Sequence, residues 1–457
     1  MPSELREALT AAGASALIPK VIDPILLEYQ RRYSPLVRAI PMQQWSADQY
    51  FFNQRTSVAN GGFVPDGGAR TVSNSVYLQL SYQMKHVESV GAVTGYAQEV
   101  TRQVIGDLRQ TEIQGSIRGY YWDVEAGCLW GNSASTLNQA QPQFDGLDTL
   151  VNQYTPVNGY QNALDKAGNT LTLAMLDELI DMVETAAAMP VFDDTWMLVM
   201  SNTSASKVAQ LLTNQQRFND TVEVAAGLIV PTYRNIPLIK TSFLSARGQG
   251  MGTVSGATST SYGAGTLNGT FKYVVSPVIS RQGETLPCAE VSVAVTTGDT
   301  IALTFTPPTG LDGLSPILYK VYRTAGAAGS ETFLGYVDAT VGLMADGVTP
   351  VIANTIVDNG TALIPAFNTT IPGTVPTQYF GTNTGMLPSG PGQENIYLIS
   401  RDRNNVVRPY IREGKPLDVY PTTASPDTLP YAVIGDMCLA VRAQRYLGRL
   451  SRVATSV

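Results

Sequence analysis

The chain has 457 residues, of which 44% are hydrophobic and only 15% charged, and its formal net charge is −7. The length allows two or three domains, and the acidic balance provides no global basic field of the kind that favours tight nucleic-acid binding. Cys128, Cys288 and Cys438 are few, far apart and odd in number, and His86 is the only histidine. The composition therefore predicts neither a disulfide framework nor a metal site.

The first residues carry acidic side chains and no apolar core of a signal peptide, and no run of about 18 apolar residues follows anywhere. We expect a protein that is made and used without export and that has no membrane partner.

In chain order, residues 17–40 predict an extended arm followed by a short amphipathic helix that Pro35 ends. Residues 45–90 alternate aromatic and polar side chains around a Gly-rich tip, which predicts a long two-stranded hairpin. Such a hairpin is not stable alone, so it must lie on another surface. Residues 98–130 have helical spacing without proline and predict a helix about 48 Å long, in which Gly106, Gly115 and Gly119 allow some curvature or a break.

A second helix is predicted over 171–189, then a strand over 196–200, a helix capped near Asn202 or Thr203, and a strand over 236–241. Further strands are predicted over 395–400, 406–412 and 431–441. These elements predict an α+β host domain.

A strand-only block interrupts this host. Residues 270–365 alternate with period two, and they are bounded by uncharged segments rich in Gly, Ser and Thr at 248–270 and in Pro at 359–393. We interpret the block as a small β-sandwich inserted into a loop of the host, and the two segments as linkers.

No catalytic motif emerges from the sequence. His86 is interpreted as part of a polar strand face, and Asp177 and Asp181 as part of the solvated face of a helix. Asp123 and Glu125 are expected to pair with arginines of neighbouring subunits. Neither a nucleophile elbow nor a phosphate-binding loop is present in the sequence, so we predict a protein that is not an enzyme and uses no cofactor.

The order of these elements resembles the major capsid protein of tailed bacteriophages, the Hong Kong 97-type fold. Ile18-Pro19 followed by Ser34-Pro35 looks like its N-terminal arm, 45–82 like its extended loop, and 98–130 like the spine helix of its peripheral domain. Residues 171–212 look like the start of its axial domain, and 408–419 with 431–442 like its returning strands.

The resemblance implies a subunit of an icosahedral shell that encloses double-stranded DNA and assembles with itself into hexamers and pentamers. It implies portal, scaffolding and decoration proteins as further partners, only non-specific contact with packaged DNA, assembly in the host cytoplasm and a final place in the virion. The expected division is an arm (1–44), a hairpin (45–90), a peripheral domain (91–145), an axial domain (146–247), an insert with linkers (248–375) and a completing segment (376–457). Some members crosslink a hairpin lysine to the next subunit, but residues 45–82 contain no lysine, so no such bond is expected.

Candidate inter-subunit contacts follow from the arm, the hairpin and the spine. They are Arg31, Arg32, Arg38, Trp45, Phe51, Phe52, Arg55, Phe63, Arg70, Arg102, Arg109 and Arg118.

The insert resembles immunoglobulin-like domains of the fibronectin type III kind, with 301–308 and 319–323 as the carriers of the likeness. Its net charge of −4 over residues 248–375 predicts an outward position, away from packaged phosphate. A decorating or stabilising role is expected, and weak binding of cell-surface glycans through Tyr262, Phe333 or Tyr336 is left open. The alternative hypothesis is a carbohydrate-active enzyme or adhesin with an accessory immunoglobulin-like module.

Overall fold

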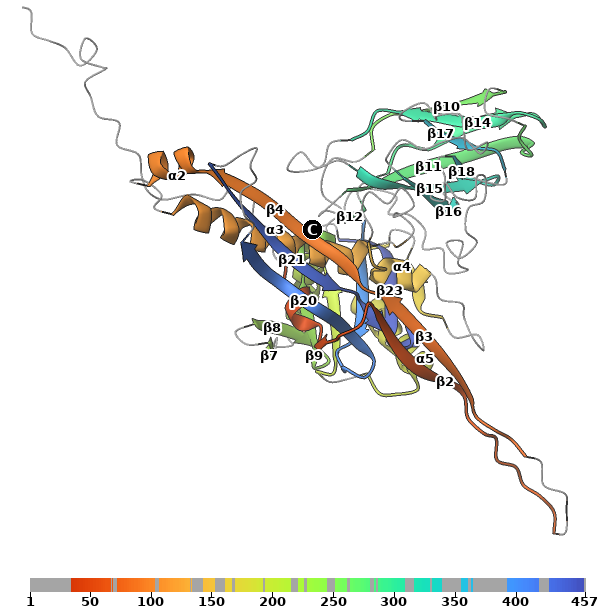
Figure 1. Ribbon diagram of the computed structural model, residues 1–457. Coiled ribbons are helices and arrows are strands. Elements are labelled where there is room, and N and C mark those ends of the chain that lie inside the picture. Colours follow the sequence, from red (N-terminus) through yellow and green to blue (C-terminus); the bar gives the residue numbers. More distant parts are fainter. Residues whose placement is uncertain are drawn as a thin grey trace, which may run out of the picture.

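The computed structural model describes residues 34–455 except for 67, 69–71, 103–106, 132, 134–142, 153–160, 167–168, 192–193, 215–220, 226–227, 245–250, 261–263, 280–282, 285–286, 309–315, 329–330, 339–354, 361–362, 365–392 and 419–426. Its described part is an α+β structure with an all-β block to one side (Figure 1). The expected α+β class is confirmed, whereas the immunoglobulin-like character of the inserted block stays a prediction.

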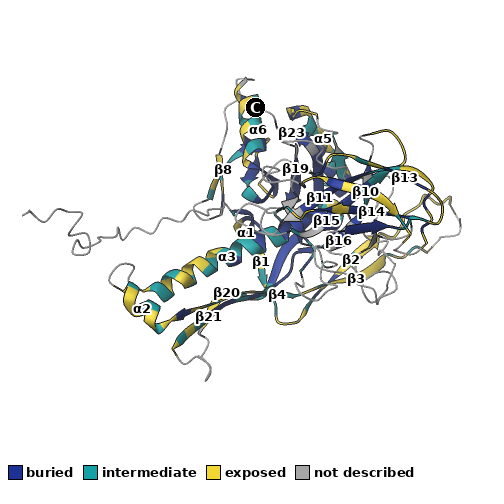
Figure 2. Cartoon of the chain, turned by 90° about the horizontal axis from the view of Figure 1, so that it is seen from above, coloured by how far each residue is buried: buried dark blue, intermediate teal, exposed yellow. Residues whose placement is uncertain are grey.

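One lobe of the host is a five-stranded sheet in the order β1-β20-β21-β4, with β22 paired to β20. Its strands are Met42–Gln44 (β1), Lys85–Thr94 (β4), Val406–Asp418 (β20), Thr428–Met437 (β21) and Ala440–Val441 (β22). Helix Leu108–Trp130 (α3) covers one face of this sheet and contacts β4, β21 and β20. Figure 2 shows α3 alternating between exposed and partly buried residues along its first half and buried residues near its end.

The helix predicted over 98–130 is divided in two, a break that its glycines allowed. Helix Gly95–Thr101 (α2) is separate, and α3 begins only at Leu108. Asp107 lies in the extended region of backbone conformation, and its side chain accepts a hydrogen bond from Gln110 N at 3.0 Å. An aspartate in this geometry caps a new helix, because it satisfies an amide that would otherwise have no partner. At 23 residues, α3 is about 35 Å long.

Tyr120 fixes α3 to the sheet at two glycines. A Cβ atom at Gly435 would lie 1.8 Å from the Tyr120 hydroxyl oxygen, and one at Gly414 would lie 2.9 Å from its ring. Gly414 also has a φ of +48°, which favours glycine. The fully buried tyrosine therefore occupies a notch that any larger residue would fill.

The other lobe is a seven-stranded sheet in the order β5-β23-β19-β6-β9-β8-β7. Its strands are Ala163–Asp165 (β5), Trp196–Met200 (β6), Thr221–Ala225 (β7), Leu228–Tyr233 (β8), Ile236–Lys240 (β9), Gln393–Ser400 (β19) and Leu447–Ala454 (β23). The helical segments of this lobe and its surroundings are Leu36–Ala39 (α1), Leu147–Asn152 (α4), Leu173–Ala187 (α5), Asn202–Asn214 (α6), Ser242–Leu244 (η2) and Gln444–Tyr446 (η5). The predicted strand over 196–200 is confirmed, and the predicted helix over 171–189 is confirmed with ends within two residues.

The hairpin pairs Gln49–Ser57 (β2) with Val76–Gln83 (β3) and extends well away from the body in Figure 1. The predicted two-stranded hairpin is confirmed, but it is shorter than the predicted 45–90. Residues 85–94 form β4, which pairs with β21 over ten residues instead of belonging to the hairpin.

The all-β block lies between β9 and β19, which both flank β6. Since β9 runs parallel to β6 and β19 antiparallel, the chain leaves β9 and enters β19 at the same end of these strands. An insertion at this point leaves the seven-stranded sheet continuous.

Two sheets form the block, in the orders β10-β14-β17-β18 and β12-β11-β15-β16, with β13 paired to β11. Their strands are Val254–Ser259 (β10), Gly269–Ile279 (β11), Gly283–Glu284 (β12), Val291–Val295 (β13), Thr300–Phe305 (β14), Pro316–Thr324 (β15), Thr332–Asp338 (β16), Thr355–Asp358 (β17) and Leu363–Ile364 (β18). The interpretation of 248–270 as linker is wrong for β10, which pairs with β14 over six residues. Its Gly, Ser and Thr residues hide the strand signal, because Thr258 and Val254 are its only β-branched residues.

Candidate functional site

Aromatic side chains anchor the root of the hairpin inside its own subunit. Trp45 and Tyr50 meet edge to face with ring centroids 4.8 Å apart, and Phe52 stacks on Tyr82 at 5.8 Å. The Tyr82 hydroxyl donates to Val441 O at 2.8 Å, and Arg442 Nη2 donates to the Tyr50 hydroxyl at 2.7 Å. These contacts orient the base of the hairpin rigidly.

Beyond the root, apolar side chains of the hairpin are exposed. Tyr77 is 66% exposed, Phe63 is fully exposed and Phe51 is about half-exposed. The other exposed members are Val58, Val64, Val72, Val76, Leu78 and Leu80. Exposed apolar surface on a projecting two-stranded element is typical of protein–protein contacts.

The candidate contact residues fall into three groups. Phe52 is buried and Trp45 partly buried in the hairpin root, whereas Arg38, Phe51, Arg55, Phe63, Arg102 and Arg118 are exposed. Arg109 donates to Pro430 O at 3.3 Å on the neighbouring strand, and Arg102 lies 3.6 Å from Glu99. The predictions for Arg31, Arg32 and Arg70 fall outside the described residues.

The expectation that Glu125 pairs with an arginine of a neighbouring subunit is wrong. It lies fully buried on α3, accepts a hydrogen bond from Thr241 Oγ1 at 2.6 Å and one from Val37 N at 3.4 Å. Burial raises the pKa of Glu125 to about 8, against the lowering effect of these bonds. The carboxyl group on α3 therefore links the segment at α1 to Thr241, which follows β9 of the seven-stranded sheet.

A buried ionic cluster joins the inserted block to the host. The Asp148 carboxylate on α4 accepts bonds from Lys320 Nζ at 2.7 Å, Arg449 Nη1 at 2.8 Å and the Tyr397 hydroxyl at 3.0 Å. We call these four residues the Asp148 cluster. Burial opposes ionisation here, but the charges of Lys320 and Arg449 outweigh it and lower the pKa of Asp148 to about 2.

Glu394 fixes the point where the chain returns from the block. At the start of β19 it is buried and accepts hydrogen bonds from Ser204 Oγ at 2.7 Å, Thr203 Oγ1 at 2.5 Å and the Ser201 hydroxyl. Ser201 Oγ also accepts from Ser204 N at 3.1 Å, so the cap of α6 is Ser201 rather than the predicted Asn202 or Thr203.

His86 lies in a charged group on the sheet face opposite α3. Its Nδ1 is 2.7 Å from Asp436 Oδ1 on the paired strand, its Nε2 is 3.3 Å from Glu88, and Arg412 Nε donates to Asp436 at 2.5 Å. The hydrogen bond to Asp436 raises the pKa of His86, with burial acting against it and Glu88 adding to it. This is a strand-face ion group, as the sequence predicted.

The predicted solvated face of α5 is confirmed for Asp181, which is exposed, and Asp177 on the same face is partly buried and has partners. Asp177 accepts from the Tyr233 hydroxyl at 2.5 Å and lies 3.1 Å from Arg234 Nε, and Glu178 pairs with Lys166. Among the described residues there is no group of three or more His, Cys, Asp or Glu side chains placed to hold a metal ion. Within the same residues, no helix is long and apolar enough to cross a membrane.

Part of the chain, including the hairpin and α3, is similar to a known protein family. Residues 41–248 match the family model of the SU10 major capsid protein. The match covers a little under half of the chain, and over this part the chain is similar to a major capsid protein, as the sequence predicted. The matched part begins at β1 and ends after η2, just before the inserted block, so it contains the hairpin, the spine helix and most of the axial lobe. The enzyme or adhesin alternative has no support.

Solved structures of similar proteins include "Gordonia phage Cozz" (9% identity, 99% of this chain and 98% of that chain, TM-score 0.48) and "The capsid of Myoviridae Phage XM1" (9%, 96% and 98%, 0.45). A third is the holo-SrpI encapsulin complex of Synechococcus elongatus PCC 7942 (13%, 98% and 98%, 0.46). At these scores the likeness by itself carries no argument. No curated protein matches the chain.

Sequence reasoning missed the Asp148 cluster. Lys320 offered a signal, because it stands in the middle of the otherwise apolar run Leu318-Tyr319-Lys320-Val321-Tyr322. A lysine within such a strand is buried only where it is paired. The partners were not predictable, since Asp148 and Arg449 lie far away in sequence. Tyr262 lies outside the described residues, and so do the side chains of Phe333 and Tyr336, so the glycan-binding hypothesis stays a prediction.

Proposed function

We propose that this capsid subunit assembles into hexamers and pentamers chiefly through its hairpin, with the inserted block facing outward as a stabilising or decorating domain. Separate portal, scaffolding and decoration proteins would complete assembly in the host cytoplasm. The observation that carries the proposal is the hairpin, which projects from the body with apolar side chains exposed on both faces.

Register supports a two-sided contact. Tyr77 faces Arg55 across the hairpin and Leu78 faces Gln54, so Tyr77 and Leu78 point to opposite faces and both are exposed. A neighbouring subunit of the same kind is the partner that a shell subunit meets on all sides. Arg38, Arg55, Arg102 and Arg118 are proposed to add ion pairs, each of about 0–1 kcal/mol.

Charge supports the outward position of the block. Its described cations are engaged in ion pairs: Lys272 with Glu290 at 3.5 Å, Lys320 with Asp148, and Arg323 with Asp358 at 2.7 Å. The described surface therefore offers packaged phosphate no uncompensated positive charge to bind. An inward block would also take volume from the genome.

The test uses purified full-length protein and electron microscopy. Tyr77→Ser and Leu78→Ser should each reduce the yield of closed shells at least about tenfold, because each removes exposed contact area from the hairpin. Unfolding of the unassembled subunit should stay unchanged. The matched control is Val90→Ser on β4, which is about as exposed as Tyr77 (64% against 66%) but lies outside the hairpin.

Shells that form normally from both hairpin variants would contradict the assigned contact. Gold-labelled antibody against the block should bind intact shells; labelling only after the shells are broken would place the block inside.

A further inference from the structure

The Asp148 cluster joins three parts of the chain that are distant in sequence. Asp148 comes from the host before the insertion, Lys320 from β15 of the inserted block, and Tyr397 and Arg449 from the host after it. The side chains of Asp148, Lys320 and Arg449 are 3%, 6% and 2% exposed. The ion pairs are thus interior ones, at the place where the block meets both halves of the host.

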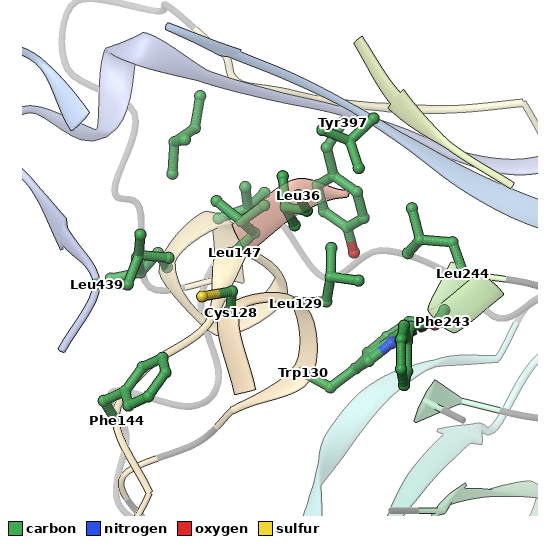
Figure 3. Close-up of a cluster of buried hydrophobic side chains, with 14 of the residues drawn as sticks. Leu36, Cys128, Leu129, Trp130, Phe144, Leu147, Phe243, Leu244, Tyr397 and Leu439 are labelled. Atoms are coloured by element: carbon green, nitrogen blue, oxygen red, sulfur yellow. Dashed lines mark hydrogen bonds between the residues drawn. The ribbon is translucent and has the colours of Figure 1, made fainter. Parts of the chain in front are cut away.

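Apolar contacts surround this junction. The Lys320 ammonium lies 5.4 Å from the centroid of the Trp130 ring at the end of the spine helix, and Trp130 Nε1 donates to Phe243 O at 2.8 Å. Figure 3 shows Trp130 beside Phe243, with Leu244 and Tyr397 nearby. One hydrophobic cluster runs through Trp130 and Phe243 of the host and on through Tyr273, Tyr319 and Val321 of the block. The block and the host therefore share a core.

We propose that the Lys320–Asp148 ion pair is an orientation lock that fixes the inserted block to the shell subunit and holds the two host halves together. The inference rests on the proposed stabilising role of the block and names the residues that perform it. The block then acts as an internal clamp in every subunit, with a single fixed direction relative to the hairpin and the spine.

Electrostatics explains why a charge pair suits this task. An interior ion pair adds little net stability because both groups lose their hydration, but it strongly penalises every arrangement in which one charge is buried alone. A purely apolar interface would allow the block to pack against the host in several orientations. The ion pair favours the one orientation in which Lys320 Nζ lies 2.7 Å from Asp148 Oδ2.

The Asp148 cluster also predicts which substitutions destabilise the subunit most. Removing Lys320 leaves Asp148 paired with Arg449, so the host should stay folded while the block loosens. Removing the Asp148 charge leaves two buried cations without their shared carboxylate, which should be worse. The double variant Asp148→Asn with Lys320→Met removes one of those cations and should recover part of the loss.

The experiment is hydrogen–deuterium exchange of the full-length, unassembled subunit, read on peptides from β15 and α4. In Lys320→Met these peptides should exchange about tenfold faster or more, while peptides from β4 and β21 stay unchanged. The matched control is Lys272→Met, which removes the partly exposed pair with Glu290 from the same sheet and should leave β15 and α4 protected.

Exchange in Lys320→Met equal to that in Lys272→Met would overturn the lock. If Lys320→Met does not fold, the soluble yields decide: the lock requires the double variant to exceed Asp148→Asn, and equal or lower yield of the double variant overturns it. Electron microscopy of the same preparations separates the two proposals. If Lys320→Met forms normal shells and its exchange is unchanged, the lock is rejected and the proposed assembly stands. If wild-type protein forms no shells, the proposed assembly is rejected and the exchange result still decides the lock.

Discussion

Glu125 is held by a hydroxyl and a backbone N–H in the interior of the subunit, and this makes its protonation part of the folding equilibrium. Its pKa rises from 4.5 to about 8 because burial disfavours the charged form. Above pH 4.5 the unfolded chain releases the proton while the folded chain keeps it, so stability falls as pH rises, until the folded carboxyl ionises near pH 8.

Glu125→Gln should remove this slope, since glutamine keeps an acceptor for Thr241 and cannot ionise. Between pH 5 and 8 the wild-type subunit should lose about 1.4 kcal/mol per pH unit from this group, and the variant should be the more stable of the two at pH 8. Denaturant unfolding at both pH values measures the difference. Glu112→Gln, at an exposed position on the same helix, is the control, and an unchanged slope in Glu125→Gln would contradict the assignment.

The contribution of Asp148 to stability changes with pH in the opposite direction to that of Glu125. Its folded pKa of about 2 lies below the ordinary 3.8, so its contribution is complete above pH 3.8 and disappears as pH falls through 2. Exchange protection of β15 and α4 should therefore be the same at pH 7 and pH 5, once corrected for the intrinsic rate. Loss of protection already at pH 5 would show that another group controls the junction.

At the scale of elements, the contact between the spine helix and its sheet depends on the notch that holds Tyr120. Gly435→Ala would place a Cβ atom 1.8 Å from the Tyr120 hydroxyl oxygen and should destabilise the subunit by about 1–3 kcal/mol, as overpacking of a core does. Gly115→Ala on the same helix meets nothing within 4 Å and should stabilise it by up to about 1 kcal/mol. Thermal unfolding of both variants should show shifts of opposite sign.

At the scale of the whole molecule, the inserted block is continuous with the host core, although the host sheet closes without it. Replacing residues 254–392 with a short linker should leave the seven-stranded sheet able to form, but it removes Lys320 and should expose Trp130, Phe243 and Asp148. We expect the truncated subunit to unfold at lower temperature and to aggregate. A truncated subunit with wild-type thermal stability would contradict the shared core.

The sequence by itself determined the elements whose signal is local. Period-two alternation indicated the hairpin and β15, the leucine spacing indicated α5, and the uncharged segments marked where the host chain is interrupted. A break within 98–130 was allowed for by its glycines, but Asp107 was not recognised as the cap at which α3 begins, although it has the residue type of a helix cap. Strand β10 was missed because small polar residues carry little β signal.

Only the tertiary structure decided the direction and the partners of the side chains. Glu125 and Lys320 are single charges in mixed or apolar segments, and whether such a charge is exposed, neutral or paired depends on groups brought to it from elsewhere in the chain. Folding placed Asp148, Lys320, Tyr397 and Arg449 around one carboxylate across separations of up to 301 residues. No local pattern encodes such a meeting, because the free energy of a buried charge depends on its nearest neighbours in space rather than in sequence.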